Sequence, residues 1–319
     1  MRVNQRFAAL FALVVVAAAV SPLTVAARGG KQGTTASSAA SPARTSPATN
    51  PAESAPSPIA AAAVAAPRDS AALVAALQQV VAGSGATVGV TVVELGGQDP
   101  ITWSWDGTTV FTAGSTYKLA ALMMEAENIA AGTADPNGLV CYQESDYEAG
   151  WFDDYAPGVC FTRRELASRA AKQSDNTAGH MLVRDLGGAG VLNAWTASIG
   201  TTSSAFFEGN TTTAADLAVL WVAEANGELG GAAAQAWLYP LLTGSTTETG
   251  IPAGLPAGST MVHKTGTIDA VDNDAALVMS GPDGAYVLTV MTDGLGGAAG
   301  WGLIASASAA VWQAELART

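Results

Sequence analysis

The 319-residue chain has few of the side chains that hold metals or redox centres, with two cysteines and two histidines. It contains no H-E-x-x-H segment, which is typical of zinc hydrolases, and no C-x-x-C pair, which is typical of zinc or thiol redox sites. A G-x-S-x-G segment is also missing. We therefore expect no metal and no cofactor, and we disfavour a serine activated by histidine and aspartate.

Positive charge is scarce as well. The chain has 14 lysines and arginines against 27 acids, which gives a formal net charge of −13. An acidic protein is repelled by nucleic acid phosphates and by anionic membrane surfaces. We therefore expect no nucleic acid partner and no strong membrane association of the mature domain. A small-molecule partner and a monomer are expected as well.

The N-terminus has the features of an export signal over residues 1–27. Arg2 and Arg6 supply a basic start, and the apolar run at 7–20 is too short to be a convincing membrane span. Small residues at 25–27 offer a cleavage site, and an uncleaved anchor is the alternative. The sequence therefore predicts a secreted, extracytoplasmic protein.

The rest of the chain divides by composition into a linker and one domain. Residues 28–68 are rich in alanine, serine and proline and hold almost no large apolar side chain, so this linker is predicted to be disordered. Residues 69–319 are long enough for one large domain. Its two cysteines, Cys141 and Cys160, are predicted to form a disulfide because the chain is exported and their number is even.

Hydrophobic periodicity and turn residues predict an α/β (α+β) fold for this domain. The predicted elements, in chain order, are a helix at 70–82, strands at 87–95 and 101–107, a helix from Ser115, a mostly helical middle at about 131–257, strands at 259–268, 272–281 and 285–294, and a helix at 298–316. Pairing the early strands with the late strands gives a five-stranded antiparallel sheet flanked by helices. The helical middle then forms an inserted all-helical lobe.

One of only four lysines stands in an apolar helical stretch. Lys118 follows Ser115 by three positions and therefore lies on the same helix face. Apolar neighbours lower the pKa of an amine, and a neutral amine can take the proton of a serine hydroxyl. Judged on this motif alone, an N-cap serine beside a lysine that extends its amine to solvent is the simpler interpretation.

Two further motifs favour the catalytic interpretation. S-D-N occurs at residues 174–176 and K-T-G at 264–266, each once and in this order after S-x-x-K at 115–118. With these three motifs, the sequence from 69 to 319 resembles class A β-lactamases and penicillin-binding proteins. The resemblance implies a site between the sheet and the helical lobe.

The resemblance also implies roles for individual residues. Ser115 would attack a strained or peptide-like amide, and Lys118 would accept its proton. Ser174 would pass a proton to the departing nitrogen, and Lys264 would keep this relay electropositive. The residues assigned to substrate binding are Asn176, Thr265, Gly266 and Thr267, with the amides of Ser115 and Thr267 as the oxyanion hole.

Two departures from the class A pattern put parts of that chemistry in doubt. The E-x-x-L-N loop, whose glutamate activates the deacylating water in those enzymes, is missing from the shortened stretch at 198–218. Glu208 is a candidate replacement base, although a solvated or capping acid is the favoured interpretation. Asp272 stands where many relatives have an arginine that binds a substrate carboxylate, and Arg184 is one candidate substitute.

Two further features bear on the site: the segment between the cysteines, which leaves two interpretations open, and His263. The segment between the cysteines holds Tyr147, Trp151 and other aromatics, which either stack on substrate or pack on the segment itself. His263 precedes Lys264 in a strand, so the alternation of side chains predicts that His263 faces away from the site.

The sequence therefore predicts a secreted serine hydrolase that acts on amide bonds. Ser115 would be acylated by a β-lactam or a peptide-like amide, and water would release the acyl group slowly because the loop glutamate is missing. One alternative is a D,D-peptidase or transpeptidase-like enzyme that acts on cell-wall peptide. Another is a penicillin-binding sensor that stays acylated.

Overall fold

The computed structural model describes residues 71–97 and 99–318. The predicted export signal and linker lie outside the described residues. In the described part, no helix is both long enough and apolar enough to cross a membrane.

A five-stranded antiparallel sheet forms the centre of the domain, in the spatial order β2-β1-β9-β8-β7. Its strands are β1 (Thr87–Glu94), β2 (Thr102–Trp105), β7 (Met261–Ile268), β8 (Val271–Val278) and β9 (Tyr286–Asp293). β1 pairs with β2 on one side and with β9 on the other, so that Val90 lies opposite both Trp105 and Val290. The predicted pairing of early with late strands is confirmed, and β7 becomes an edge strand.

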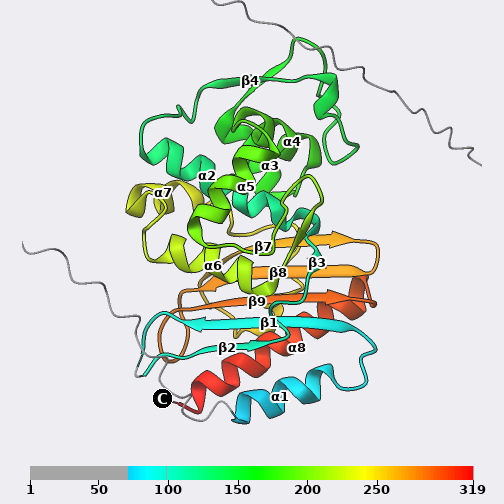
Figure 1. Ribbon diagram of the computed structural model, residues 1–319, viewed down its shortest axis with the longest axis vertical. Coiled ribbons are helices and arrows are strands. Elements are labelled where there is room, and N and C mark those ends of the chain that lie inside the picture. Colours follow the sequence, from blue (N-terminus) through cyan, green and yellow to red (C-terminus); the bar gives the residue numbers. More distant parts are fainter. Residues whose placement is uncertain (1–70, 98, 319) are drawn as a thin grey trace, which may run out of the picture. The chain divides into compact units, whose positions relative to one another are not determined.

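Two hydrophobic clusters cover the two faces of this sheet because successive strand side chains point in opposite directions. On β8, Ala276 and Val278 pack with the two terminal helices, α1 (Ala71–Val81) and α8 (Gly297–Leu316). The neighbouring residue Leu277 packs with the helical lobe on the other face. Figure 1 shows α1 and α8 on one side of the sheet and the lobe on the other.

The lobe consists of the helices that the sequence predicted between the two groups of strands. They are α2 (Tyr117–Ala130), α3 (Arg163–Lys172), α4 (Asn176–Asp185), α5 (Ala189–Ile199), α6 (Ala214–Ala225) and α7 (Gly231–Leu238). Short 3₁₀ turns occur at η1 (Gly114–Thr116), η2 (Glu144–Asp146) and η3 (Ile251–Gly254). α6 lies on β1 and β9 and joins the lobe to the sheet (Figure 1).

Side-chain caps fix where several lobe helices begin. The hydroxyl of Thr162 accepts a hydrogen bond from the backbone N–H of Glu165 at 3.1 Å, so Thr162 is the N-cap of α3. The carboxylate of Glu165 does not complete a capping box but pairs with Arg169 at 2.8 Å. Asp175 caps α4 by accepting from the N–H of Ala178, and this fixes the S-D-N segment at the start of that helix.

The two cysteines form the predicted disulfide between Cys141 and Cys160. They lie opposite each other in a small sheet made by β4 (Leu139–Cys141) and β5 (Cys160–Thr162). A second small sheet pairs β3 (Phe111–Thr112) with β6 (Thr211–Thr212), and β3 leads directly into η1. The disulfide thus closes the loop at 142–159, and the β3–β6 pair fixes the segment that leads into η1 and α2.

Candidate active site

Ser115 lies on the η1 turn, immediately before α2, and Lys118 lies in the first turn of that helix. The Nζ atom of Lys118 is 2.9 Å from the Oγ atom of Ser115. Lys118 is fully buried, so the simpler interpretation, a lysine that extends its amine to solvent, is wrong. The structure brings together the pair that the S-x-x-K spacing predicts.

Two oxygen atoms hold the Lys118 amine in place. Its Nζ is 2.6 Å from the carbonyl oxygen of Ser174 and 2.6 Å from Oδ1 of Asn176. Burial, followed by the positive charge of Lys264, lowers the pKa of Lys118 well below its usual range. A neutral amine has two N–H donors for these oxygens and one lone pair directed to Ser115, so it can accept the serine proton.

Ser174 connects Lys118 with the second motif lysine. Its backbone has a φ of 58°, a left-handed conformation that costs energy for a serine and is typical of functional positions. The Lys264 Nζ donates to the Ser174 hydroxyl at 3.0 Å and to its own neighbour, the carbonyl of Thr265, at 2.8 Å. Burial lowers the pKa of Lys264 to about 7, against the opposing charge of Asp274. Ser174 therefore lies between two lysines that can exchange a proton through its hydroxyl.

The edge strand β7 approaches the η1 turn closely at Gly266. A Cβ atom at this position would lie 2.4 Å from the carbonyl oxygen of Ala113 and 2.9 Å from the backbone nitrogen of Ser115, so only glycine fits. Gly114 is similarly close, with its ideal Cβ 3.0 Å from the backbone nitrogen of Thr267. The amides of Ser115 and Thr267 thus lie next to each other at the nucleophile, as an oxyanion hole requires.

Glu148 is a site residue that the sequence did not single out. Its Oε1 accepts a hydrogen bond from the Asn176 Nδ2 at 2.7 Å, and its Oε2 lies 3.2 Å from the Nε2 of His180. Its backbone also exchanges two hydrogen bonds with Thr177. Because the Asn176 oxygen faces Lys118, Glu148 holds the amide in the orientation that leaves one Nδ2 hydrogen for a substrate.

The loop at 142–159 is held mainly by Asp175 of the S-D-N segment. Asp175 accepts hydrogen bonds from the Tyr155 hydroxyl at 2.7 Å and from the backbone of Trp151 at 3.2 Å. Tyr155 and Phe152 pack on the guanidinium of Arg169, whereas Tyr147 and Trp151 are exposed. Two aromatics of this loop therefore pack within the protein, as one interpretation predicts, and two remain accessible.

The shortened loop between α5 and β6 presents an aromatic residue to the nucleophile helix. Phe207 packs against Tyr117 with ring centroids 5.5 Å apart and against His180 at 5.0 Å. Glu208, the candidate replacement base, has an exposed side chain. Burial raises the pKa of the Tyr117 hydroxyl, so this phenol is not a base at neutral pH.

The position of the missing arginine is acidic and buried. Asp272 lies opposite Thr267 in the β7–β8 pair and accepts a hydrogen bond from the Thr267 hydroxyl at 2.7 Å. Arg184 does not take the arginine's place. It pairs with Asp146 at 2.7 Å and donates to the carbonyl of Cys141, both in the disulfide-closed region.

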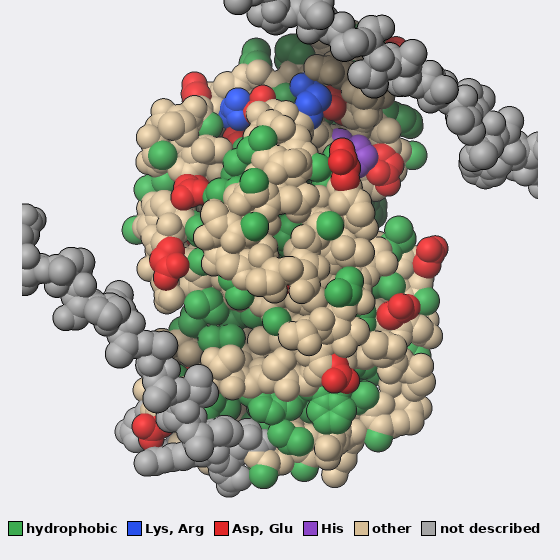
Figure 2. Space-filling view, viewed as in Figure 1, with side chains coloured by type: hydrophobic (Ala, Val, Ile, Leu, Met, Phe, Trp, Pro, Cys, Tyr) green, Lys and Arg blue, Asp and Glu red, His purple; other side chains and the backbone are tan. Residues whose placement is uncertain are grey.

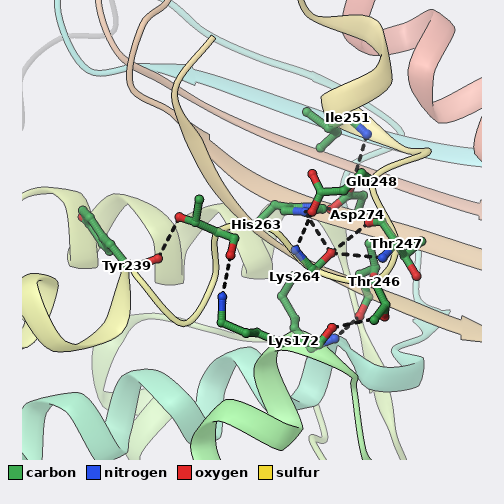
Figure 3. A network of polar contacts seen from close by, with 12 residues as sticks. Lys172, Tyr239, Thr246, Thr247, Glu248, Ile251, His263, Lys264 and Asp274 are labelled. Carbon is green, nitrogen blue, oxygen red and sulfur yellow. Dashed lines mark hydrogen bonds and ion pairs between the residues drawn. The ribbon is translucent and has the colours of Figure 1, made fainter. Parts of the chain in front are cut away.

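His263 faces away from Ser115, as the strand alternation predicted. Its Nδ1 is 2.9 Å from Asp274 and its Nε2 is 3.3 Å from Glu248, with the ring almost fully buried (Figure 3). Burial lowers the pKa of His263, but the charges and hydrogen bonds of Asp274 and Glu248 outweigh it and raise the pKa to about 9. The His263 imidazolium, Asp274 and Glu248 form an ionic cluster on the face of β7 opposite to the Lys264 side chain.

Comparisons with known proteins agree with this geometry. The model of the beta-lactamase enzyme family matches residues 72–314. Beta-lactamase AST-1 of Nocardia asteroides is 32% identical over 210 residues, and the match covers 58% of this chain and 64% of that protein. The matched part of the chain thus spans less than two thirds of that relative's length.

Two solved structures share the fold over nearly their whole length. The structure of PBP-A superposes with a TM-score of 0.71 and 28% identity, covering 77% of this chain and 96% of that one. A beta-lactamase from Sphaerobacter thermophilus superposes with a TM-score of 0.68 and 25% identity, covering 78% and 98%. The family model alone covers well over half of the sequence, and the three motifs meet at one serine. The chain therefore belongs to the beta-lactamase enzyme family.

Proposed function

We propose that this protein is a secreted serine hydrolase that is acylated at Ser115 by a β-lactam or a peptide-like amide. The observation that carries the proposal is the buried Lys118 amine, with its lowered pKa, 2.9 Å from the Ser115 hydroxyl. Lys118 alone can take the proton of the Ser115 hydroxyl, so acylation needs no second base.

The first half of the reaction is derived from the contacts of the two lysines. The Ser115 proton moves to Lys118 as the Oγ atom bonds to the carbonyl carbon, and the amides of Ser115 and Thr267 stabilise the oxyanion. The carbon–nitrogen bond then breaks. The leaving nitrogen takes the proton of the Ser174 hydroxyl, which is replaced from Lys264 at 3.0 Å or Lys118 at 3.5 Å. The product of this half-reaction is an ester on Ser115.

Removal of the acyl group is the slower half in this proposal. Hydrolysis of the ester needs a base that takes a proton from water, and general-base help typically contributes about 10²–10⁴ in rate. The loop that carries this base in class A enzymes here directs Phe207 at Tyr117 and exposes Glu208. Glu148 is a carboxylate that hydrogen-bonds to Asn176 of the site. Slow β-lactamase-type turnover is the expected result.

The intact mass of the protein, measured over time with benzylpenicillin, tests this proposal. We expect one added acyl group that appears within minutes and is lost slowly. Ser115→Ala should abolish the added mass, whereas Ser306→Ala, which removes an exposed serine on α8, should leave it unchanged. Labelling of Ser115→Ala that peptide mapping places on another serine would contradict the assignment.

The D,D-peptidase and sensor alternatives share the acylation step and differ only in the fate of the acyl-enzyme, and the structural similarity to PBP-A keeps both open. An adduct that persists for days favours a sensor. Release of the terminal residue from an acyl-D-alanyl-D-alanine peptide, faster than release of penicilloate, favours a peptidase.

A further inference from the structure

We propose that the Ser115 site selects substrates that present a hydrogen-bond donor, such as a carboxamide or ammonium group, at the Thr267–Asp272 position, instead of a carboxylate. This inference rests on the proposed acylation of Ser115. It concerns the chemical group of the substrate that lies beside the scissile amide, next to strand β7.

The hydrogen bond between Thr267 and Asp272 sets the polarity of this position. Thr267 is exposed at the edge strand, and its hydroxyl proton is directed to the buried Asp272 carboxylate at 2.7 Å. An ionised carboxylate only accepts hydrogen bonds, so the Thr267 hydroxyl must donate to it. The threonine then presents oxygen lone pairs to a substrate, and these attract a donor.

Asp272 lies at the N-terminus of α8, which partly offsets the cost of burying its negative charge. The start of α8 packs against it so closely that a Cβ at Gly300 would lie 2.3 Å from the Asp272 Oδ2. A helix N-terminus stabilises an anion. Burial raises the pKa of this carboxyl, and the hydrogen bond from Thr267 opposes that shift. The charge that a substrate meets through Thr267 is therefore negative.

A second carboxylate lies at the Asn176 end of the site. Glu148 is about half exposed and bonds to the substrate-facing amide of Asn176. Its negative charge adds to that of Asp272, and like charges oppose the binding of a substrate anion. On the face shown in Figure 2, acids are spread over lobe and sheet, whereas lysines and arginines gather at one end of the lobe.

Among the described residues, no arginine forms an ion pair with Asp272 or Glu148, so the negative charges of these two acids are not neutralised by a guanidinium. The pairs formed by arginines are Arg163 with Glu125 and Asp185, Arg169 with Asp154 and Glu165, Arg184 with Asp146, and Arg318 with Glu94. Lys264 lies on the same strand as Thr267, but its amine is buried and donates to Ser174 and Thr265. A carboxylate thus lacks the bidentate partner that usually recognises it.

Acylation by benzylpenicillin and by its carboxamide, in which the carboxylate becomes CONH₂, tests the inference. We expect the carboxamide to acylate Ser115 at least tenfold faster, measured by intact mass, which corresponds to about 1.4 kcal/mol. Asp272→Asn should reduce this preference to less than threefold. Asp269→Asn removes the same charge from an exposed position of the same hairpin and should retain the full preference.

The salt dependence of the unmodified protein is an independent readout if Asp272→Asn does not fold. Raising the salt concentration should accelerate acylation by the carboxylate and leave the carboxamide unaffected. Equal or faster acylation by the carboxylate, without this salt effect, would overturn the inference while leaving the serine hydrolase proposal intact. Failure of both compounds and of a fluorophosphonate to label Ser115 would instead overturn the proposed function, and the inference with it.

Discussion

The rate of acylation should fall steeply as the pH rises from 7 to 9, because Lys264 loses its proton in this range. Burial lowers the pKa of this amine to about 7, and in the proposed mechanism its ammonium form is the closer of the two donors that return a proton to Ser174. At pH 9, about 1% of the ammonium form remains, since each pH unit above the pKa removes about a factor of ten. Since about half of the amine is protonated at pH 7, the expected fall between pH 7 and pH 9 is about 50-fold.

The second-order rate constant of acylation, measured across pH 5–10 with a neutral substrate, reports the free enzyme. Lys264→Arg should remove the decrease above pH 7, because a guanidinium stays charged, although its different shape should lower the rate at every pH. Lys172→Arg is the matched control. Lys172 donates to the backbone of Thr243 outside the site, so the variant should retain the decrease.

A rate that stays level from pH 7 to 9 in the unmodified protein would refute this reasoning. It would mean that Lys264 keeps its proton despite burial, or that proton return to Ser174 does not limit acylation. A decrease that persists unchanged in Lys264→Arg would assign the titration to another group.

Three further results are expected. Reduction of the Cys141–Cys160 bond should lower the free energy of unfolding by about 3 kcal/mol, judged from the separation of 19 residues, and a change below 0.5 kcal/mol in urea titrations would contradict this. Stopped-flow nitrocefin hydrolysis should show a stoichiometric burst and then a slow phase that Glu148→Gln slows further and Glu208→Gln does not, whereas fast turnover that collapses in Glu208→Gln would make Glu208 the base. His263 has a folded-state pKa of about 9, above its usual 6.5, so its stabilisation is complete below pH 6.5 and is lost as the pH rises through 9. The difference in unfolding free energy between the unmodified protein and His263→Gln should therefore shrink by about 3 kcal/mol between pH 6 and 10, and a constant difference would show that the imidazolium is not stabilised.

The sequence was sufficient for the features that depend on local patterns. The strands of the sheet alternate in the face that they bury, and α3 begins at Thr162, whose hydroxyl caps the N–H of Glu165 three residues on. The Ser115–Lys118 contact follows from the spacing of one helical turn, and Gly266 follows from the K-T-G motif. Each of these depends on neighbours within about four residues or on one hairpin, so a single sequence contains the information.

The departures from the family pattern were visible in the sequence, but their consequences were not. Asp272 was recognisable as a misplaced acid, whereas its hydrogen bond with Thr267 depends on the β7–β8 register. Arg184 was one candidate partner for a substrate carboxylate, and only the fold shows that Asp146 holds it. Both outcomes depend on which strand residue lies opposite which, or on which loop covers a helix.

Contacts between distant segments were decided by the tertiary structure alone. Glu148 reaches Asn176 across 28 residues because the disulfide-closed loop folds back onto α4, and nothing in the local pattern of either segment shows this. Phe207 faces Tyr117 for a similar reason, across 90 residues of chain. The sequence by itself determined the contact between Ser115 and Lys118 and the strand that carries the third motif, because these are set by short-range geometry. The contact of Glu148 with Asn176 and that of Phe207 with Tyr117 formed only when long-range packing brought a carboxylate and an aromatic ring to the same site.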